Sequence, residues 1–376
     1  MSERISHRSG NYVSSKRIYA VDLFCGVGGL TKGMARAGII VKLGVDIDPA
    51  CEYPYAANNK SKFLKKAIEE LKPKEIEVAF RKNGIRLLTG CAPCQTFSTY
   101  NKKAPPEDKR WFLLQHFSRL VHKIQPELVT MENVPGLKEQ EVFRSFLADL
   151  ELCNYYFDYC VVNCADYGIP QHRNRLVLLA SKFGPIRLLR HEELKARPRS
   201  VRNAIGNLPP ISAGEVNQAD RLHQSSILSA VNLRRIRSSK QGGTWRDWED
   251  DLVAKCHQKA TGKTYHSVYG RMSWDAPAPT ITTQFYGFGN GRFGHPDQDR
   301  AISLREGAIL QSFPRNYAFT SNENPIFKKT IARLIGNAVP VKLGEVIGKS
   351  IFYHINVVGA GARRLKLGSK ATGTQV

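Results

Sequence analysis

The chain has 376 residues, which is enough for one large domain or for two domains with separate cores. It contains 56 Lys and Arg residues against 33 Asp and Glu residues, for a net charge of +23. This excess favours a polyanionic partner, nucleic acid above all, although a merely basic surface fits the charge equally well. No apolar run is long enough to cross a bilayer, and residues 1–16 lack the apolar segment of a secretory signal, so we expect no membrane association and a cytoplasmic location.

Strand-like and helix-like segments alternate along the first half of the chain. Apolar residues recur at helical spacing from 111 to 124, for example, and a short apolar run at 85–89 stops at Gly90. Strands are expected at 17–24, 39–47, 85–89, 128–131, 156–162 and 176–180, and helices at 30–37, 111–124 and 142–150. This alternation predicts an α/β fold with a doubly wound, mostly parallel sheet.

The periodicity weakens after residue 185, where Gly, Pro, Ser, Arg and aromatic residues become frequent. We therefore expect a first domain at 1–185 and a second, smaller and irregular domain at 186–326. A C-terminal segment at 327–358 contains an apolar helix at 341–355. The basic tail at 359–376 has few large apolar residues and is expected to be disordered.

A glycine-rich turn follows the first expected strand, in the run Asp22-Leu23-Phe24-Cys25-Gly26-Val27-Gly28-Gly29. Glycines let the backbone bend sharply and approach a ligand closely, and Asp46 at the end of the next strand is placed to accept hydrogen bonds from a ribose. The pattern fits a nucleotide-like cofactor and does not separate NAD from S-adenosylmethionine. The spacing is not G-x-G-x-x-G, which disfavours a dinucleotide, and a tight turn without a ligand remains an alternative.

Three side chains capable of chemistry, those of Cys94, Glu132 and Arg173, are expected where strands give way to loops. Such strand ends face the ligand crevice of an open α/β sheet. A thiolate could add to carbon 6 of a cytosine, while an acid at the ring nitrogen and a cation at the exocyclic oxygen stabilise the charge that develops. Cys91 and Cys94 also form a C-x-x-C pair, which fits a redox site or half of a zinc site. No second compact Cys or His pair accompanies it, so no metal is expected.

Together these motifs resemble those of the DNA (cytosine-5)-methyltransferases. The matching blocks occur in the order typical of that family: 22–29, Gly90-Cys91-Ala92-Pro93-Cys94-Gln95-Thr96-Phe97-Ser98, Glu132-Asn133-Val134, Gln171-His172-Arg173-Asn174-Arg175, Arg305-Glu306 with Leu310-Gln311-Ser312-Phe313-Pro314, and Gly336-Asn337-Ala338-Val339-Pro340. The resemblance implies a methyltransferase that binds S-adenosylmethionine, carries a DNA-recognition domain at 186–326 and closes its first domain with the segment 327–358.

The resemblance also implies roles for the residues of the base site. Cys94 would be the nucleophile, and Glu132 would hold the ring nitrogen and amino group of the target cytosine. Asn133 would fix the neighbouring loop. Arg173 would contact the base oxygen and nearby backbone, with Arg175 in support.

A cofactor site is implied in the same way. The expected cofactor-binding residues are Phe24, Gly26, Gly28 and Gly29 in the turn, Asp46 on the ribose, Ile47 on the adenine, Leu113 as a further apolar wall and Asn337 near the methionine end. One position departs from the family pattern, because Ala67 stands where an acid usually meets the adenine amino group. Glu69 is a neighbouring acid that could substitute.

The expected partner is double-stranded DNA from which the target base is flipped out. Among the basic residues at 186–299, some should contact phosphates, although each one singly fits a solvated surface charge. We expect a monomer that belongs to a restriction-modification system or acts alone. In the first case a cognate restriction endonuclease would act on the same sequence without forming a stable complex.

Other functions remain open at this stage. An RNA cytosine-5 methyltransferase would share Cys94, Glu132 and Arg173. A catalytically silent DNA-binding protein could keep the fold, and a thiol-disulfide oxidoreductase could use Cys91 and Cys94. The recognised DNA sequence does not follow from the chain, because contacts in an irregular domain obey no residue-to-base code.

Overall fold

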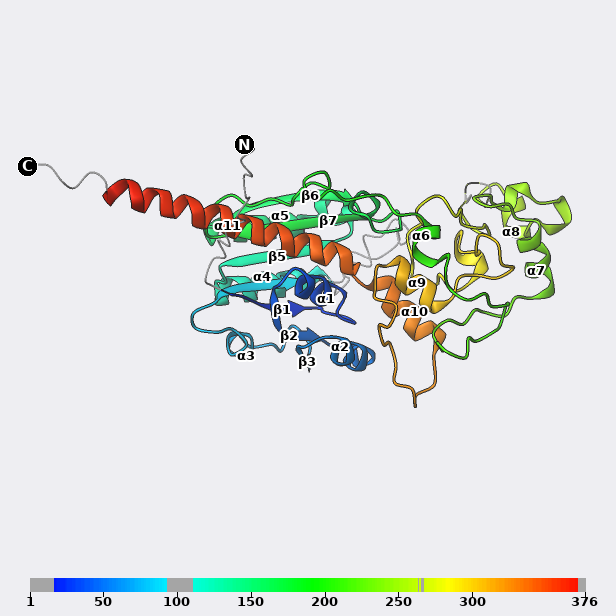
Figure 1. Cartoon of the computed structure of the whole chain (residues 1–376), viewed down its shortest axis with the longest axis horizontal. Coiled ribbons are helices and arrows are strands. Elements are labelled where there is room, and N and C mark those ends of the chain that lie inside the picture. Colours follow the sequence, from blue (N-terminus) through cyan, green and yellow to red (C-terminus); the bar gives the residue numbers. More distant parts are fainter. Residues whose placement is uncertain (1–16, 93–110, 263, 265–266, 371–376) are drawn as a thin grey trace, which may run out of the picture.

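The computed structural model describes residues 17–92, 111–262, 264 and 267–370. A seven-stranded sheet in the order β3-β2-β1-β4-β5-β7-β6 forms the centre of its first lobe (Figure 1). The strands are β1 (Ile18–Leu23), β2 (Ile40–Asp46), β3 (Lys62–Lys65), β4 (Ile85–Gly90), β5 (Leu128–Asn133), β6 (Tyr156–Asn163) and β7 (Asn174–Ser181). β7 runs antiparallel to both of its neighbours, and the other described pairings are parallel. The predicted α/β class with a mostly parallel sheet is confirmed.

Helices cover both faces of this sheet and build most of the regular structure of the second lobe. They are α1 (Gly29–Arg36), α2 (Glu52–Asn58), α3 (Pro73–Glu77), α4 (Trp111–Ile124), α5 (Glu141–Leu152), α6 (Val201–Ile205), α7 (Ala230–Arg237), α8 (Lys255–Gln258), α9 (Leu304–Leu310), α10 (Lys328–Asn337) and α11 (Val341–Lys370). The elements expected before residue 181 are confirmed to within a few residues. The short β3, α2 and α3 were not expected, since their sequences carry no clear period.

The alternation of side chains along each strand divides the core of the first lobe into two layers. Val21 and Leu23 of β1 face a cluster that includes Phe117 of α4 and Phe146 of α5. Ile18 and Ala20 face the other way, into a cluster with residues of α1 and α11. The two layers make a three-layer helix–sheet–helix lobe, in which a strand buried on both faces reads as a nearly continuous apolar run.

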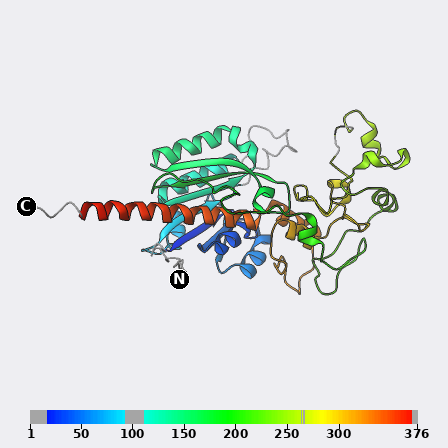
Figure 2. The ribbon, with the colours of Figure 1, turned by 45° about the horizontal axis from the view of Figure 1, so that its top comes forward.

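Glycines allow α1 and α11 to pack unusually closely on one face of the sheet, as the second view also shows (Figure 2). A Cβ atom added to Gly33 would lie 2.1 Å from the carbonyl oxygen of Val341, and one added to Gly344 would lie 2.9 Å from that of Leu30. The segment after Pro340 thus returns to the first lobe and covers the start of the chain's first helix.

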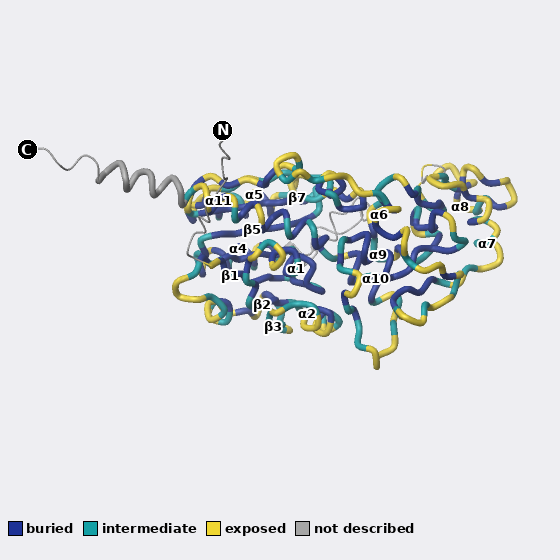
Figure 3. The backbone as a smooth tube through the Cα atoms, in the orientation of Figure 1, coloured by how far each residue is buried: buried dark blue, intermediate teal, exposed yellow. Residues whose placement is uncertain are grey.

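The second lobe lies beyond one end of the strands and has few regular elements, although much of its chain is buried (Figure 3). Buried arginines take the place of strand pairing there. Arg271 donates to the backbone carbonyls of Ile236, Ser239, His295 and Gln298 at 2.7–3.1 Å. Each such bond fixes a piece of irregular chain, because a buried carbonyl needs a donor.

The C-terminal segment differs from the expectation in two respects. Its first helix, α10, packs against α9 of the second lobe, so α11 alone returns to the sheet. In addition, α11 continues to Lys370, well beyond the expected end at 355. The tail expected to be disordered from residue 359 is therefore helical as far as Lys370, since its Ala, Leu, Arg and Lys residues favour helix and no Pro interrupts them.

None of the helices in the described part of the chain is both long and apolar enough to cross a membrane.

The close approach of α1 and α11 predicts a large effect of a single methyl group. Gly33→Ala should lower the free energy of unfolding by about 1–3 kcal/mol, because the methyl group would press on a backbone carbonyl of α11 that cannot rotate away. Urea denaturation checks this value. Ala35→Ser, at an exposed position of the same helix, should change it by less than about 0.5 kcal/mol. Equal stability of the two variants would contradict the described packing.

Candidate active site

The site lies at the edge of the sheet where β1, β4 and β5 end. The reversed direction of β7 brings its amino end to the same edge, with Asn133 of β5 beside Leu176. Arg173 and Arg175 therefore reach the site from the start of a strand. The expectation that Arg173 follows the end of a strand is wrong in this respect, because a local sequence pattern does not show strand direction.

Cys94 lies outside the described residues, and the last described residue before it is Ala92. The amide of Asn133 fixes this end, donating from Nδ2 to the carbonyl oxygen of Ala92 at 2.9 Å. The Oδ1 atom of the same side chain accepts a hydrogen bond from the backbone N–H of Val134 at 2.8 Å. Asn133 is buried, so both bonds are shielded from water. The start of the segment that carries Cys94 is thus tied to the end of β5.

Glu132 points into the protein near the end of β5, with its side chain only 7% exposed. Nε of Arg175 lies 2.9 Å from its Oε1 atom, close enough for an ion pair. The N–H is not directed at this oxygen, however, and among the described residues Oε1 has no hydrogen-bond donor. A buried carboxylate oxygen without a donor is able to take one from a ligand.

Arg173 is fully enclosed and bridges the two lobes. Its Nη1 donates to the carbonyl oxygen of Ile281 at 3.0 Å, and its Nη2 donates to that of Gly336 at 2.9 Å. Burial, followed by the neighbouring charge of Arg175, lowers the pKa of Arg173 to about 9. Arg173 thus contacts backbone, as expected, while the ion pair with the acid comes from Arg175.

Gln171, two residues earlier, makes the same junction with a neutral side chain. Its Nε2 donates to Oε1 of Gln311 at 2.6 Å and to the carbonyl oxygen of Leu310 at 3.1 Å, and its Oε1 accepts from the backbone N–H of Ile281 at 3.0 Å. Gln171 is completely buried. The motif at 171–175 therefore mainly joins the two lobes, and Arg175, its last residue, reaches Glu132.

The glycine turn beside this edge has the conformation of a ligand cradle. Phe24, Gly26 and Gly28 have positive φ angles of 57°, 52° and 85°. Such an angle is strained for a phenylalanine, and residues of this kind concentrate at functional sites. A Cβ atom added to Gly26 would meet nothing within 4 Å, whereas one added to Gly29 would lie 2.2 Å from the carbonyl oxygen of Val339. The turn is thus packed on one side and open at Gly26.

Asp46 fixes this turn and keeps capacity to bind. Its Oδ2 accepts from the N–H of Gly26 at 2.8 Å, and its Oδ1 accepts from the N–H of Asp48 at 2.9 Å, which leaves each oxygen a further lone pair. Next to it, the side chain of Ile47 is 67% exposed. An open glycine, a carboxylate with spare acceptors and an exposed apolar side chain fit a ligand with a hydroxylated sugar and an apolar ring.

The remaining expected cofactor residues are less closely tied to this turn. Leu113, near the start of α4, is partly buried against the core of the first lobe. Asn337 is exposed at the end of α10, next to Gly336, whose carbonyl oxygen accepts from Arg173. Ala67 lies just after β3, with the exposed Glu69 two positions further on. Nothing in the described contacts links either Ala67 or Glu69 to the turn.

A buried acid beneath the turn had no assigned role in the sequence analysis. Asp22 is completely buried, and its Oδ2 accepts a 2.6 Å hydrogen bond from Thr31 of α1, while its Oδ1 has no partner among the described residues. Burial raises the pKa of Asp22 to about 7. Thr31 continues the network to Tyr55 of α2. Asp22 thereby joins the turn to both helices, and its position as the first residue of the glycine motif was the signal for it.

The basic residues expected on DNA are mostly engaged in the second lobe. Arg202 pairs with Asp275 and Arg234 with Asp251, and Arg235 lies over the ring of Trp248. Exposed pairs contribute little stability, so DNA phosphates could displace them at small cost. In the part of the chain that the structure covers, no cluster of three or more His, Cys, Asp or Glu residues is arranged to hold a metal ion.

Comparisons with known proteins show the family to which the chain belongs. The family model for the C-5 cytosine-specific DNA methylase matches residues 18–353. The chain is 51% identical over 334 residues to the Type II methylase M.HgiDII of Herpetosiphon aurantiacus, covering 88% of this chain and 94% of that one. It is 31% identical to the Type II methyltransferase M1.BsuMI of Bacillus subtilis (strain 168), covering 92% and 82%.

Among solved structures, an Escherichia coli prophage protein described as a DNA modification methyltransferase superposes with a TM-score of 0.67 at 25% identity, covering 90% of this chain and 99% of that one. The family match spans both lobes and every motif of the site. The chain therefore belongs to the C-5 cytosine-specific DNA methylases.

Proposed function

We propose that the protein methylates carbon 5 of a cytosine flipped out of duplex DNA, with S-adenosylmethionine as the methyl donor and Cys94 as the nucleophile. The observation that carries this proposal is the single edge at which Glu132, Arg175 and the Ala92 end of the Cys94 segment meet. The open glycine turn with Asp46 adjoins that edge.

The reaction begins at the thiol of Cys94. Its thiolate forms a bond to carbon 6, and the electron pair of the 5,6 double bond moves to carbon 5. When bound, S-adenosylmethionine supplies an electrophilic methyl group. Carbon 5, now methylated, then loses its proton to water. The electron pair of that C–H bond re-forms the 5,6 double bond as the bond between sulfur and carbon 6 breaks, and the thiolate is regenerated. Burial, followed by the neighbouring charge of Glu132, raises the pKa of the Cys91 thiol, which disfavours the thiolate form at that position.

Glu132 and Arg175 share the task of holding the ring. The unpartnered oxygen of Glu132 can accept a hydrogen bond from the amino group of the cytosine, and from the ring nitrogen once that nitrogen takes up a proton as the ring becomes electron-rich. Arg175 lies beside it and supplies a cation for the base oxygen. Arg173 acts through the fold: by gripping the carbonyls of Ile281 and Gly336 it sets the second lobe against the acid.

The two lobes divide the work. The sheet lobe would bind the cofactor, and the second lobe would read the DNA sequence. Names of relatives such as the Type II methylase M.HgiDII support a place in a restriction-modification system, in which a restriction endonuclease acts on the same sequence without a stable complex. A cytoplasmic monomer fits this role.

The nucleophile is tested with DNA that contains 5-fluorocytosine, since fluorine at carbon 5 cannot leave as a cation and the adduct persists. Bisulfite sequencing of DNA from expressing cells first identifies the recognised sequence. The wild type and Cys91→Ser should then form a covalent complex with that duplex on a denaturing gel, and Cys94→Ser should form none. A complex with Cys94→Ser, or methyl transfer to transfer RNA and not to DNA, would contradict the proposal.

Substitution of Arg173 should mainly lower stability, and substitution of Arg175 should mainly lower catalysis. Arg173→Lys should lower the free energy of unfolding by about 2–3 kcal/mol, because buried carbonyls lose a forked, charged donor. Arg175→Lys should change it by less than about 1 kcal/mol and lower kcat by roughly ten- to a hundredfold. Denaturant titration and single-turnover kinetics measure the two effects. A normal kcat for Arg175→Lys with a stable but inactive Arg173→Lys would restore the roles first expected.

Asp46 should matter for the cofactor beyond its contacts with the turn. Asp46→Asn keeps an acceptor but loses the charge, so the Kd for S-adenosylmethionine should rise by roughly ten- to a hundredfold. Isothermal titration calorimetry gives this constant directly. Glu52→Gln, an exposed change in α2, serves as the control and should leave the Kd unaltered.

A further inference from the structure

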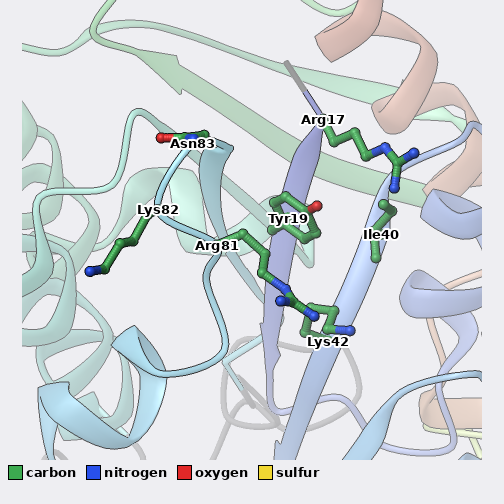
Figure 4. Close-up of a pocket in the computed structure, with 7 residues that line it drawn as sticks. All are labelled: Arg17, Tyr19, Ile40, Lys42, Arg81, Lys82 and Asn83. Carbon is green, nitrogen blue, oxygen red and sulfur yellow. The ribbon is translucent and has the colours of Figure 1, made fainter. Parts of the chain in front are cut away.

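A hollow of about 690 Å³ lies at the opposite edge of the sheet, where β1 and β2 begin. We name it the amino-edge groove, and define it by Arg17, Tyr19, Ile40, Lys42, Arg81 and Lys82. Tyr19 lies near its centre, with Arg17, Lys42 and Arg81 around the ring (Figure 4). These side chains come from β1, from β2 and from the loop before β4. The groove is separate from the site, because Tyr19 and Ile40 stand at the starts of the strands whose other ends carry the glycine turn and Asp46.

The cations of the groove have no ion-pair partner among the described residues, and two nearby acids are already paired with other cations. Within the described ranges, none of Arg17, Lys42, Arg81 and Lys82 takes part in an ion pair. Glu127 is held by Arg86, with 2.7 Å between Nη2 and Oε1, and Glu75 is held by Lys66 at 2.9 Å. Four positive charges around one hollow repel one another, and an anion that sits between them relieves this repulsion.

The floor of the groove is fixed by packing. A Cβ atom added to Gly84 would lie 2.3 Å from the ring of Tyr19, so only glycine allows the ring to rest on the backbone there. The hydroxyl of Tyr19 and the amide of Asn83 add uncharged donors to the cations. Lys, Arg, Tyr and Asn are the side chains that proteins use on phosphate oxygens.

The cations continue beyond the hollow. A neighbouring depression of about 600 Å³ shares Lys42, Arg81 and Lys82 with the groove and adds Lys62, together with Glu75, whose charge Lys66 pairs. A small anion would need the cations of only one of these two hollows. A row of cations along the edge fits a chain of phosphates, and duplex DNA is the polyanion that this enzyme meets.

We infer that the amino-edge groove binds the phosphate backbone of a second segment of duplex DNA, without regard to sequence, while the opposite edge holds the target segment. Such a contact raises the local concentration of long DNA at the enzyme and weakens steeply with salt. It does not require methyl transfer, so it can be tested independently of the catalytic roles.

Site-resolved photo-crosslinking tests the inference directly. The photoreactive amino acid p-benzoylphenylalanine replaces Asn83 in the full chain, and a fluorescent duplex of about 40 base pairs without the recognised sequence serves as the probe. The duplex should crosslink at this position in both the wild-type background and Cys94→Ser. The crosslink should disappear when Arg17, Lys42, Arg81 and Lys82 are all changed to Gln.

A matched control removes the same charge elsewhere. Arg36, Lys60, Lys123 and Lys195 are exposed, lie outside the groove and have no ion pair among the described residues, so their change to Gln should keep the crosslink. In fluorescence anisotropy, the slope of log K against log salt should fall by up to about 3.6 in the groove variant, from about 0.9 for each phosphate contact, and by much less in the control. Thermal unfolding checks that both variants are folded.

Several outcomes would overturn the inference. These are the absence of a crosslink at position 83, a crosslink that survives in the groove variant, an equal loss in the control variant, and competition by tripolyphosphate at the groove without any capture of duplex. Loss of methylation in Cys94→Ser with an intact crosslink would leave the inference standing, because that result concerns only the catalytic edge.

Discussion

The reversed direction of β7 is the constraint on which the site depends. In a purely parallel sheet, the residues just before a strand lie at the edge opposite to the site. Because β7 is antiparallel to β5 and β6, the segment 171–175 arrives at the same edge as Glu132 and the end of β4. This one reversal brings an acid, an arginine and the anchor of the second lobe together at one place.

The arginine that attaches the second lobe and the arginine that contacts the acid lie close together in the sequence. Arg175 touches the acid, and Arg173, two positions earlier, holds carbonyls of the second lobe. The two tasks fall to different side chains, since Arg173 is enclosed just before β7 and Arg175 lies beside the acid within that strand. A shift of the second lobe would therefore move Arg175 relative to the Glu132 carboxylate, because only one residue separates Arg173 from Arg175.

The sequence predicts the sheet lobe well because its signals are local. Apolar runs predict the strands, helical spacing predicts Trp111–Ile124, and the glycines at 26, 28 and 29 predict the turn. It does not show the direction of β7 or the tasks of Arg173 and Arg175, because these depend on contacts with distant parts of the chain: β5 for the strand, Glu132 for Arg175, and Ile281 and Gly336 for Arg173. The second lobe is held by buried arginines such as Arg271, and these look like surface or DNA-binding charges in the sequence. The helix predicted at 341–355 is shorter than α11, which continues to Lys370, because the last turns of α11 are polar.

The hold of Arg173 on the second lobe has a consequence for how such enzymes diversify. Both of its partners, at Ile281 and Gly336, are main-chain oxygens, which every amino acid offers alike. The attachment is therefore indifferent to the side chains around it, and a lineage can exchange or rebuild the intervening loops without losing the joint. On the proposal that the second lobe reads the DNA, new target specificities can evolve while the catalytic edge stays unchanged, as long as the carbonyls of Ile281 and Gly336 keep their places.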